Sequence, residues 1–128
     1  MVEKYTFTKA ERLTLKNSID KLFLSGRSFN VFPVKFYWML SDGDQHFPAQ
    51  VLISVSKKKF KRAVDRNYIK RKIREAYRLN KHQLYDNLVR KNKKIFLALV
   101  YLDDKDISFE IIKNSISKGF KNLDSLIS

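Results

Sequence analysis

The spacing of apolar side chains along the chain switches between helical and strand periods and predicts helix, two strands, helix, strand, helix. In the first helix, apolar residues recur three or four positions apart, at Leu15, Ile19, Leu22 and Phe23. Thr14 is the candidate N-cap, and Gly26 follows the expected end. The pattern indicates a short amphipathic helix near the start of the chain.

Two stretches rich in aromatic and β-branched residues follow the first helix and are typical of strands. They run from Val31 to Leu40 and from Ala49 to Ser56. Between them, Asp42 and Gly43 supply the residue types that favour a turn. We therefore expect these two strands to pair as a hairpin. The aromatic residues expected in the core of the sheet are Phe32, Phe36, Trp38 and Phe96.

The second half of the chain contains a basic helix, an apolar strand and a closing helix. The basic helix is expected over Asp65 to Asn80. The run from Ile95 to Leu102 is continuously apolar, which is typical of a central strand covered on both faces. Asp106 or Ser108 can cap the closing helix. Its apolar residues keep helical spacing at Phe109, Ile112, Ile116, Phe120, Leu123 and Ile127.

Length and composition predict one α+β domain that spans residues 1–128. A chain of 128 residues with 44% hydrophobic content can build its own core. The chain has no cysteine, and His46 and His82 alone are a poor basis for a metal site. The longest apolar run, from Ile95 to Leu102, is far shorter than the roughly 20 residues of a membrane helix. We expect a cytoplasmic protein without a membrane partner.

The charge of the chain is concentrated in one segment. The formal net charge is +14, and residues 57–81 hold twelve Lys or Arg side chains against two acids. On a wheel of about 100° per residue, an apolar stripe forms at Ile69, Ile73, Ala76 and Tyr77. The adjoining face, from which Glu75 and Lys72 point away, gathers Asn67, Lys70, Arg71, Arg74 and Arg78, with Arg66 at its margin. Such a face predicts binding to a nucleic acid.

Two other uses of a basic helix are less consistent with the sequence. A membrane-surface helix keeps an apolar face for lipid, whereas the modest stripe of this helix has a sheet to cover. DNA recognition is harder to exclude on charge alone, although the chain shows neither helix-turn-helix spacing nor zinc ligands. The residues by themselves therefore predict a nucleic-acid partner, RNA or DNA.

Two motifs resemble the bacterial ribonuclease P protein component. "ISVSKKK" (Ile53 to Lys59) and "AVDRNYIKRKIREAYR" (Ala63 to Arg78) resemble its Ser-Val-Ser-Lys-Lys strand end and its Arg-Asn-x-x-Lys-Arg-x-x-Arg-Glu helix. "KAERLTLKNSIDKLFLSGRSF" (Lys9 to Phe29) is similar to the first helix of the family. The resemblance implies a two-layer α/β sandwich of ribosomal-protein-like type, with room for an extra strand and a left-handed β-α-β crossover. General rules would favour the right hand.

The resemblance implies the protein subunit of ribonuclease P, which assists endonucleolytic removal of the 5′ leader from precursor tRNA. The RNA subunit carries the catalysis, so no catalytic protein residue is expected, and Mg²⁺ is expected to be held mainly by the RNA. By position, the residues implied to contact the catalytic RNA are Arg62, Arg66, Asn67, Lys70, Arg71 and Arg74.

A second surface implied by the resemblance is a cleft between the first helix and the sheet that holds the single-stranded leader. The residues implied at this cleft are Ile19, Phe23, Tyr37, Ser54 and Lys57. Aromatic side chains stack on unpaired bases without regard to sequence, while cations follow the backbone. Phe23 suits core packing as well as leader stacking, whereas the hydroxyl of Tyr37 favours the wet surface.

The chain departs from the family pattern in two places. Tyr68 stands where the family usually has a third basic residue after Arg66 and Asn67, so stacking can replace a phosphate contact there. The stretch from Lys58 to Arg66 is one residue longer than usual and adds cations at Lys59, Lys61 and Arg62.

Two other function classes bear on the sequence. A stand-alone nuclease would need a convergent acid/base pair or metal carboxylates, and the acids of this chain are scattered. A ribosomal or ribosome-associated RNA-binding protein explains the charge and the aromatics, and it is the main alternative. Stimulation of precursor tRNA cleavage distinguishes the two, because a ribosomal protein would not provide it.

Overall fold

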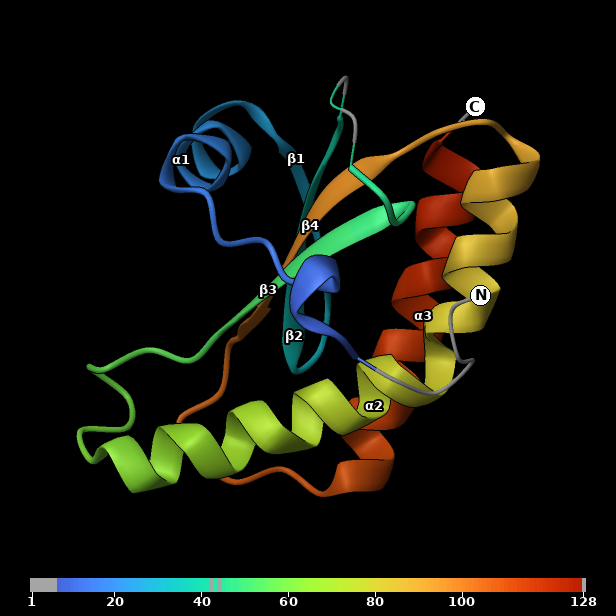
Figure 1. The fold of residues 1–128 in the computed structure, drawn as a ribbon. Coiled ribbons are helices and arrows are strands. Elements are labelled where there is room, and N and C mark those ends of the chain that lie inside the picture. The colour runs from blue at the N-terminus through green and yellow to red at the C-terminus, as the bar shows by residue number, and fades with distance from the viewer. Residues whose placement is uncertain (1–6, 42, 44, 128) are drawn as a thin grey trace.

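The computed structural model describes residues 7–41, 43 and 45–127 and has the α+β class expected from the sequence (Figure 1). After a 3₁₀ turn, η1 (Lys9–Glu11), the helices and strands follow in the order α-β-β-β-α-β-α. They are α1 (Lys16–Ser25), β1 (Arg27–Val31), β2 (Val34–Leu40), β3 (Ala49–Ser54), α2 (Ala63–Arg90), β4 (Ile95–Tyr101) and α3 (Phe109–Leu126). The room left for an extra strand is filled by β1.

The four strands form a mixed sheet in the order β1-β2-β4-β3. The predicted hairpin between the second and third of these strands is wrong, because β4 lies between β2 and β3. Instead β2 pairs antiparallel with β1 through the turn at Phe32 and Pro33. The apolar run of β4 pairs with β2 on one side and, in parallel, with β3 on the other, so it is central as predicted. Of the expected turn, Asp42 lies outside the described residues.

Helices lie on both faces of the sheet, which corrects the expected two-layer arrangement. Leu97 and Leu99 of β4 belong to the large core cluster under α2 and α3, whereas Ala98 packs with Leu13 and Leu22 beside α1. Figure 1 shows α1 separated by the sheet from α3. Successive side chains of a strand point to opposite faces, so Ala98 faces away from Leu97 and Leu99. Helix α1 therefore covers the face opposite to α2 and α3 and forms a partial third layer.

The short helix α1 differs slightly from its prediction. It ends at Gly26 as expected, but its N-cap is Leu15 rather than Thr14. The backbone N–H of Leu13 donates to the carbonyl of Val51 on β3 at 2.9 Å. This contact keeps the chain extended up to Leu15, whose side chain is 69% exposed and does not join the apolar face.

The core aromatics were predicted with one error. Phe36 and Trp38 of β2 are buried, and Phe96 is partly buried against the α1 side. Phe32 is 60% exposed, because it occupies the turn between β1 and β2 rather than a strand. Pro33 beside it cannot donate a backbone hydrogen bond to a ladder, which is why the strand stops there.

Helix α2 is longer than predicted and continues to Arg90. Its apolar stripe is buried as expected at Ile69, Ile73, Ala76 and Tyr77. Leu84 and Leu88 extend the stripe at helical spacing, so the same face stays covered to the end of the helix. Ser108 is the N-cap of α3, as one of the two predicted caps.

A buried ion pair fastens the N-terminal segment to α2. Glu11 is fully buried and Lys81 is 1% exposed. The Lys81 ammonium group donates to Glu11 Oε2 at 2.6 Å, and the backbone N–H of Thr8 donates to Oε1 at 2.8 Å. The hydroxyl of Tyr85 donates to the same carboxylate. These contacts hold the segment that leads into α1.

Candidate nucleic-acid interface

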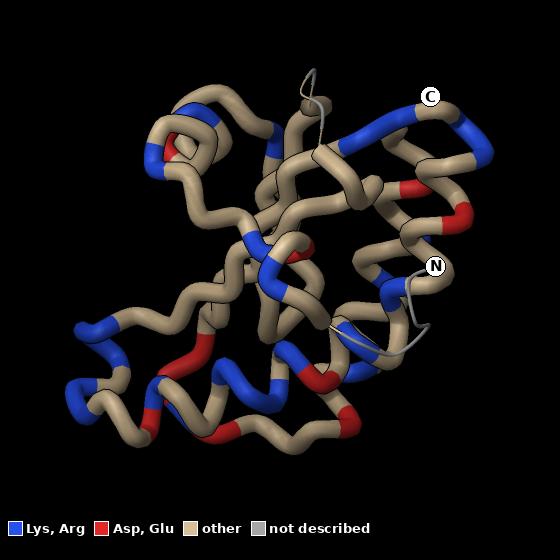
Figure 2. Tube along the Cα trace, in the orientation of Figure 1, with Lys and Arg blue, Asp and Glu red and all other residues tan. Residues whose placement is uncertain are grey.

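The first part of α2 presents a group of polar and basic side chains that we call the α2 patch: Asn67, Lys70, Arg71 and Arg74. Three of the four are exposed and Lys70 is half-buried. Figure 2 shows that Lys and Arg residues gather along this part of α2 and the loop before it. Within residues 7–41, 43 and 45–127, no hydrogen bond or ion pair engages these four side chains. Their donors are available to an anionic partner.

Two further cations predicted to contact RNA have partners inside the protein. The guanidinium of Arg66 donates to the carbonyl oxygens of Phe60 and Lys61, both at 2.9 Å. Arg62 donates to both carboxylate oxygens of Asp65, at 2.9 and 3.1 Å. The hydrogen bond from Arg62 holds the pKa of Asp65 below its usual value. Arg66 thus shapes the loop before α2, while Arg62 stays largely exposed and keeps donors facing solvent.

The edges of the α2 patch are set by two ion pairs. Lys72 points away from the patch, as predicted, and pairs with Asp106. Arg78 was grouped with the patch, but it pairs with Glu75 one turn earlier in the helix. The hydrogen bond from Arg78 also holds the pKa of Glu75 below its usual value. Among the described residues, no acid pairs with Arg71 or Arg74, whereas Glu75 pairs with Arg78.

Tyr68 lies next to the patch with its ring supported from one side. The side chain is 49% exposed. The Lys72 ammonium group lies 4.8 Å from the ring centroid and is itself held by Asp106 and by the carbonyl of Ile107. A cation over one face of an aromatic ring fixes the ring and leaves the other face for stacking.

The α1–sheet surface is the second group, and it consists of Ile19, Phe23, Tyr37, Ser54 and Lys57. The rings of Phe23 and Tyr37 meet edge to face with centroids 4.8 Å apart. Phe23 is 40% exposed, so it both packs and offers ring surface. Ile19 and Tyr37 pack against the small cluster of Leu13, Leu22 and Ala98 under α1.

Strand register brings Ser54 to the same face as Tyr37. Tyr37 on β2 and Leu52 on β3 both pair with Ala98 of β4. Two residues along each strand, Lys35 on β2 and Ser54 on β3 both pair with Val100 of β4. Because residues two apart in a strand share a face, Ser54 lies on the same face of the sheet as Tyr37. Lys57 is exposed beyond the end of β3.

Lys35 belongs to this surface, although it was not among the predicted residues. Its ammonium group lies 4.9 Å from the centroid of the Tyr37 ring. The signal was present in the sequence, because Lys35 and Tyr37 are two residues apart in one strand. An aromatic ring and a cation thus lie side by side on this face of the sheet. Proteins that bind single-stranded nucleic acids combine rings that stack on bases with cations that contact the backbone.

A hollow of about 390 Å³ also opens between the start of α1 and the sheet. It is lined by Leu15, Lys21, Gln50 and Phe96 among others. None of the predicted leader residues lines it, so the hollow and the Phe23–Tyr37 pair occupy different parts of the α1 side.

Neither a metal centre nor a membrane segment emerges from the described part of the chain. Residues 7–41, 43 and 45–127 contain no group of three His, Asp or Glu side chains that could hold a metal ion. No described helix has the length and apolar content needed to cross a bilayer.

Comparison with known proteins gives consistent matches over nearly the whole chain. The family model described as Ribonuclease P matches residues 7–124. The ribonuclease P protein component of Porphyromonas gingivalis is 36% identical over 115 residues, which cover 90% of this chain and 84% of that protein. The protein of the same description from Chlorobium phaeobacteroides is 34% identical, covering 90% and 86%.

Solved structures match the fold. A Staphylococcus aureus RNase P protein mutant with defective mRNA degradation activity is 25% identical with a TM-score of 0.66, over 90% of this chain and 89% of that one. The RNase P protein from Thermotoga maritima is 20% identical with a TM-score of 0.69, over 88% and 96%. The mixed sheet with three helices is thus shared with these proteins.

Proposed function

Because this chain belongs to the family of bacterial ribonuclease P protein components, and so is the protein subunit of that endoribonuclease in tRNA 5′-end maturation, we propose that its two surfaces hold two different RNAs. Partnership with the ribonuclease P RNA follows from the family. Membership also sets aside the ribosomal alternative.

The α2 patch binds the catalytic RNA. The observation that carries this assignment is that Arg71 and Arg74 are exposed one turn apart, with no acid paired to either within the described residues. Guanidinium groups match phosphate oxygens with two parallel hydrogen bonds, so neighbouring Arg residues can follow a folded RNA backbone. Arg62 adds a contact from the loop, and Arg66 acts mainly by holding that loop in place.

The α1–sheet surface binds the 5′ leader of precursor tRNA. The edge-to-face contact with Phe23 supports the Tyr37 ring, which can stack on an unpaired base. Lys35 beside that ring and Lys57 beyond β3 supply cations for the leader backbone. The hydroxyl of Ser54, one row along the sheet, adds a donor for phosphate or sugar oxygens. Ile19 supports the rings from the helix.

Several expectations go with this assignment. The catalytic RNA supplies the chemistry and holds most of the Mg²⁺, and the chain works in the cytoplasm on precursor tRNA rather than DNA. Residues 1–128 form one RNA-binding domain, and the β3-α2-β4 crossover has the left hand that the family resemblance implies.

The test is cleavage of a precursor tRNA by the catalytic RNA at low magnesium, with the cut site mapped. The parent protein should restore cutting at the mature 5′ end. Arg71→Ala combined with Arg74→Ala should require more protein for the same rate, whereas Tyr37→Ala should weaken the capture of leader-bearing substrate. Equal effects of both variants on binding to the catalytic RNA alone would reject the division into two surfaces.

A further inference from the structure

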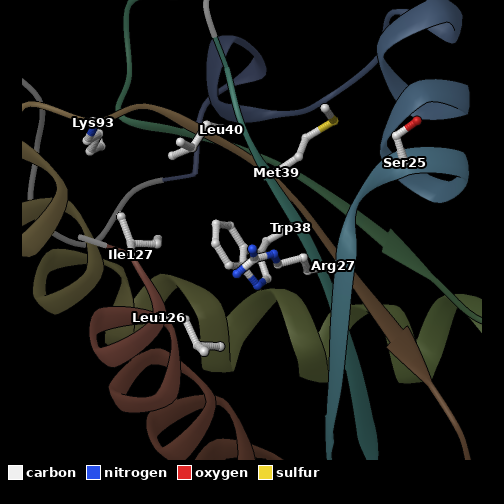
Figure 3. Close-up of a pocket in the computed structure, with 8 residues that line it drawn as sticks. All are labelled: Ser25, Arg27, Trp38, Met39, Leu40, Lys93, Leu126 and Ile127. Carbon is white, nitrogen blue, oxygen red and sulfur yellow. The ribbon is translucent and has the colours of Figure 1, made fainter.

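Figure 3 shows a pocket at one end of the sheet, and none of its lining residues belongs to either proposed surface. It has a volume of about 410 Å³, within the range of small-molecule sites. The end of α1, the start of β1, the end of β2, the loop between α2 and β4, and the end of α3 meet there. The side chains that matter are Arg27, Trp38, Leu40, Lys93, Leu126 and Ile127.

The indole of Trp38 lacks a hydrogen-bond acceptor in this pocket. Trp38 is 5% exposed, and its buried Nε1 has no partner among the described residues. A buried N–H group without an acceptor costs folding free energy unless a bound molecule accepts its hydrogen bond. Trp38 therefore places a donor at the wall of this pocket for which the described residues supply no acceptor.

Two cations line the same pocket. The Arg27 guanidinium lies 5.8 Å from the Trp38 ring centroid, and Lys93 lines the opposite part of the wall in Figure 3. Within the described part of the chain, neither pairs with an acid. The carboxylate at this end of α3, Asp124, is already engaged by Arg90 and Lys91. The pocket therefore carries uncompensated positive charge.

The remaining wall is apolar. Leu40 and Leu126 are each about half exposed, and Ile127 lies beside them. An inorganic anion would satisfy Arg27 and Lys93 but leave these side chains in water. A flat, largely apolar group joined to an anion fits both parts of the wall.

We propose that this pocket binds one unpaired nucleotide of RNA. Its phosphate lies between Arg27 and Lys93, its base packs on Leu40 and Leu126, and one of its oxygen or ring-nitrogen acceptors takes the hydrogen bond from Trp38. The ligand chemistry is a nucleoside monophosphate unit, and the charge of +14 on the chain favours it. The pocket shares no residue with the α2 patch or the α1–sheet surface, so the two assignments can fail separately.

The protein carries its own reporter for this site, because Trp38 is its single tryptophan. Adenosine 5′-monophosphate titrated into the free protein should change the Trp38 fluorescence in a saturable way. Adenosine and inorganic phosphate should each bind at least several-fold more weakly, since each satisfies only part of the wall. Equal binding of inorganic phosphate would mean a simple anion site, and the absence of any saturable change would also overturn the proposal.

Charge-neutral variants make the assignment specific. Arg27→Gln and Lys93→Gln should each weaken adenosine 5′-monophosphate binding roughly tenfold, as for loss of one charge-assisted hydrogen bond. Lys118→Gln, an exposed cation elsewhere on α3, should leave the titration unchanged. Thermal unfolding of each variant checks that it is folded. Unchanged binding in both pocket variants, or an equal loss in the Lys118 control, rejects the site.

Two RNAs could supply the nucleotide, and the same reporter separates them. Catalytic RNA alone, and then catalytic RNA with precursor tRNA, are added to the parent and to Arg27→Gln. An Arg27-dependent change on the first addition assigns the nucleotide to the catalytic RNA, and a change only on the second assigns it to the substrate. If neither RNA gives such a change, RNA does not occupy the pocket and the proposal fails.

Discussion

The carboxylate of Glu11 and the ammonium group of Lys81 form a 2.6 Å ion pair in which both side chains are buried. Tyr85 and the backbone of Thr8 donate to the same carboxylate, so its lone pairs are well satisfied. Desolvation of two charges is costly, and only such additional hydrogen bonds make a buried pair tolerable. The pair joins the segment before α1 to the middle of α2.

Removal of one partner should be strongly destabilising. Lys81→Met leaves the Glu11 charge buried without its cation, which should cost about 3–5 kcal/mol of unfolding free energy. Glu11→Leu together with Lys81→Met should recover most of that loss, because no lone charge remains. Urea unfolding of the single, the double and the control variant Lys118→Met measures these differences. A single variant as stable as the control would show that the pair is unimportant.

The same carboxylate predicts a loss of stability in acid. Burial acts to raise the pKa of Glu11, but hydrogen bonds from Lys81, Thr8 and Tyr85 outweigh it and hold that pKa below its ordinary value of 4.5. Because the folded pKa is the lower one, the stabilisation is complete above pH 4.5 and is lost as the pH falls through the folded pKa. Unfolding free energy measured against pH should decline there, and Glu11→Gln should flatten the decline.

Substitutions in the α2 patch should change the salt dependence of RNA binding. Arg71→Ala and Arg74→Ala should each lower affinity for the catalytic RNA and reduce the log–log salt slope by roughly one unit per lost phosphate contact. Filter binding at several salt concentrations measures the slope, with Lys118→Ala as the control. Lower affinity at an unchanged slope would point to altered folding instead.

Loss of the Tyr37 ring should affect the leader and spare the catalytic RNA. Tyr37→Ala should weaken binding of precursor tRNA to the holoenzyme by about 1–3 kcal/mol, the usual value of one stacked base. Affinity for mature tRNA without a leader, and for the catalytic RNA, should be unchanged. The same loss for tRNA without a leader would reject the α1–sheet surface as the leader site.

Tyr68 offers a gain-of-function test. Tyr68→Arg places a cation beside Arg71 and should steepen the salt slope of binding to the catalytic RNA by about one unit. Tyr68→Phe should keep the parent affinity if the ring stacks on a base, and Tyr68→Ala should lower it. Equal affinities for the Phe and Ala variants would show that the ring makes no stacking contact.

The sequence predicted elements whose pattern is local. The buried stripe of α2 from Ile69 to Tyr77 and the central strand at Ile95 follow from periodicity alone, and the structure confirms both. The apolar pattern alone did not locate strand β1, because its residues, Arg27 to Val31, are exposed or half-buried and show little apolar signal. The hairpin error has a related cause, since the partner of β2 depends on β4, which lies more than 50 residues later.

The candidate site was likewise predictable only where its residues follow a local pattern. The wheel placed Arg71 and Arg74 on one exposed face, and the structure places them there as well. The wheel could not show that the guanidinium of Arg66 donates to the carbonyls of Phe60 and Lys61, because that contact depends on the path of the loop before α2. Lys35 was missed although its spacing from Tyr37 puts both on one strand face. The pairing with β4, which the sequence did not reveal, adds that Ser54 lies in the same row as Lys35.

The Glu11–Lys81 pair also sets an order of events during synthesis. The two residues are 70 positions apart, and the segment before α1 additionally pairs with Val51 on β3. Of its two anchors, Val51 is made before α2, whereas Lys81 is made only with the later part of α2. The segment that leads into α1 is therefore fully fastened only after most of α2 has been made.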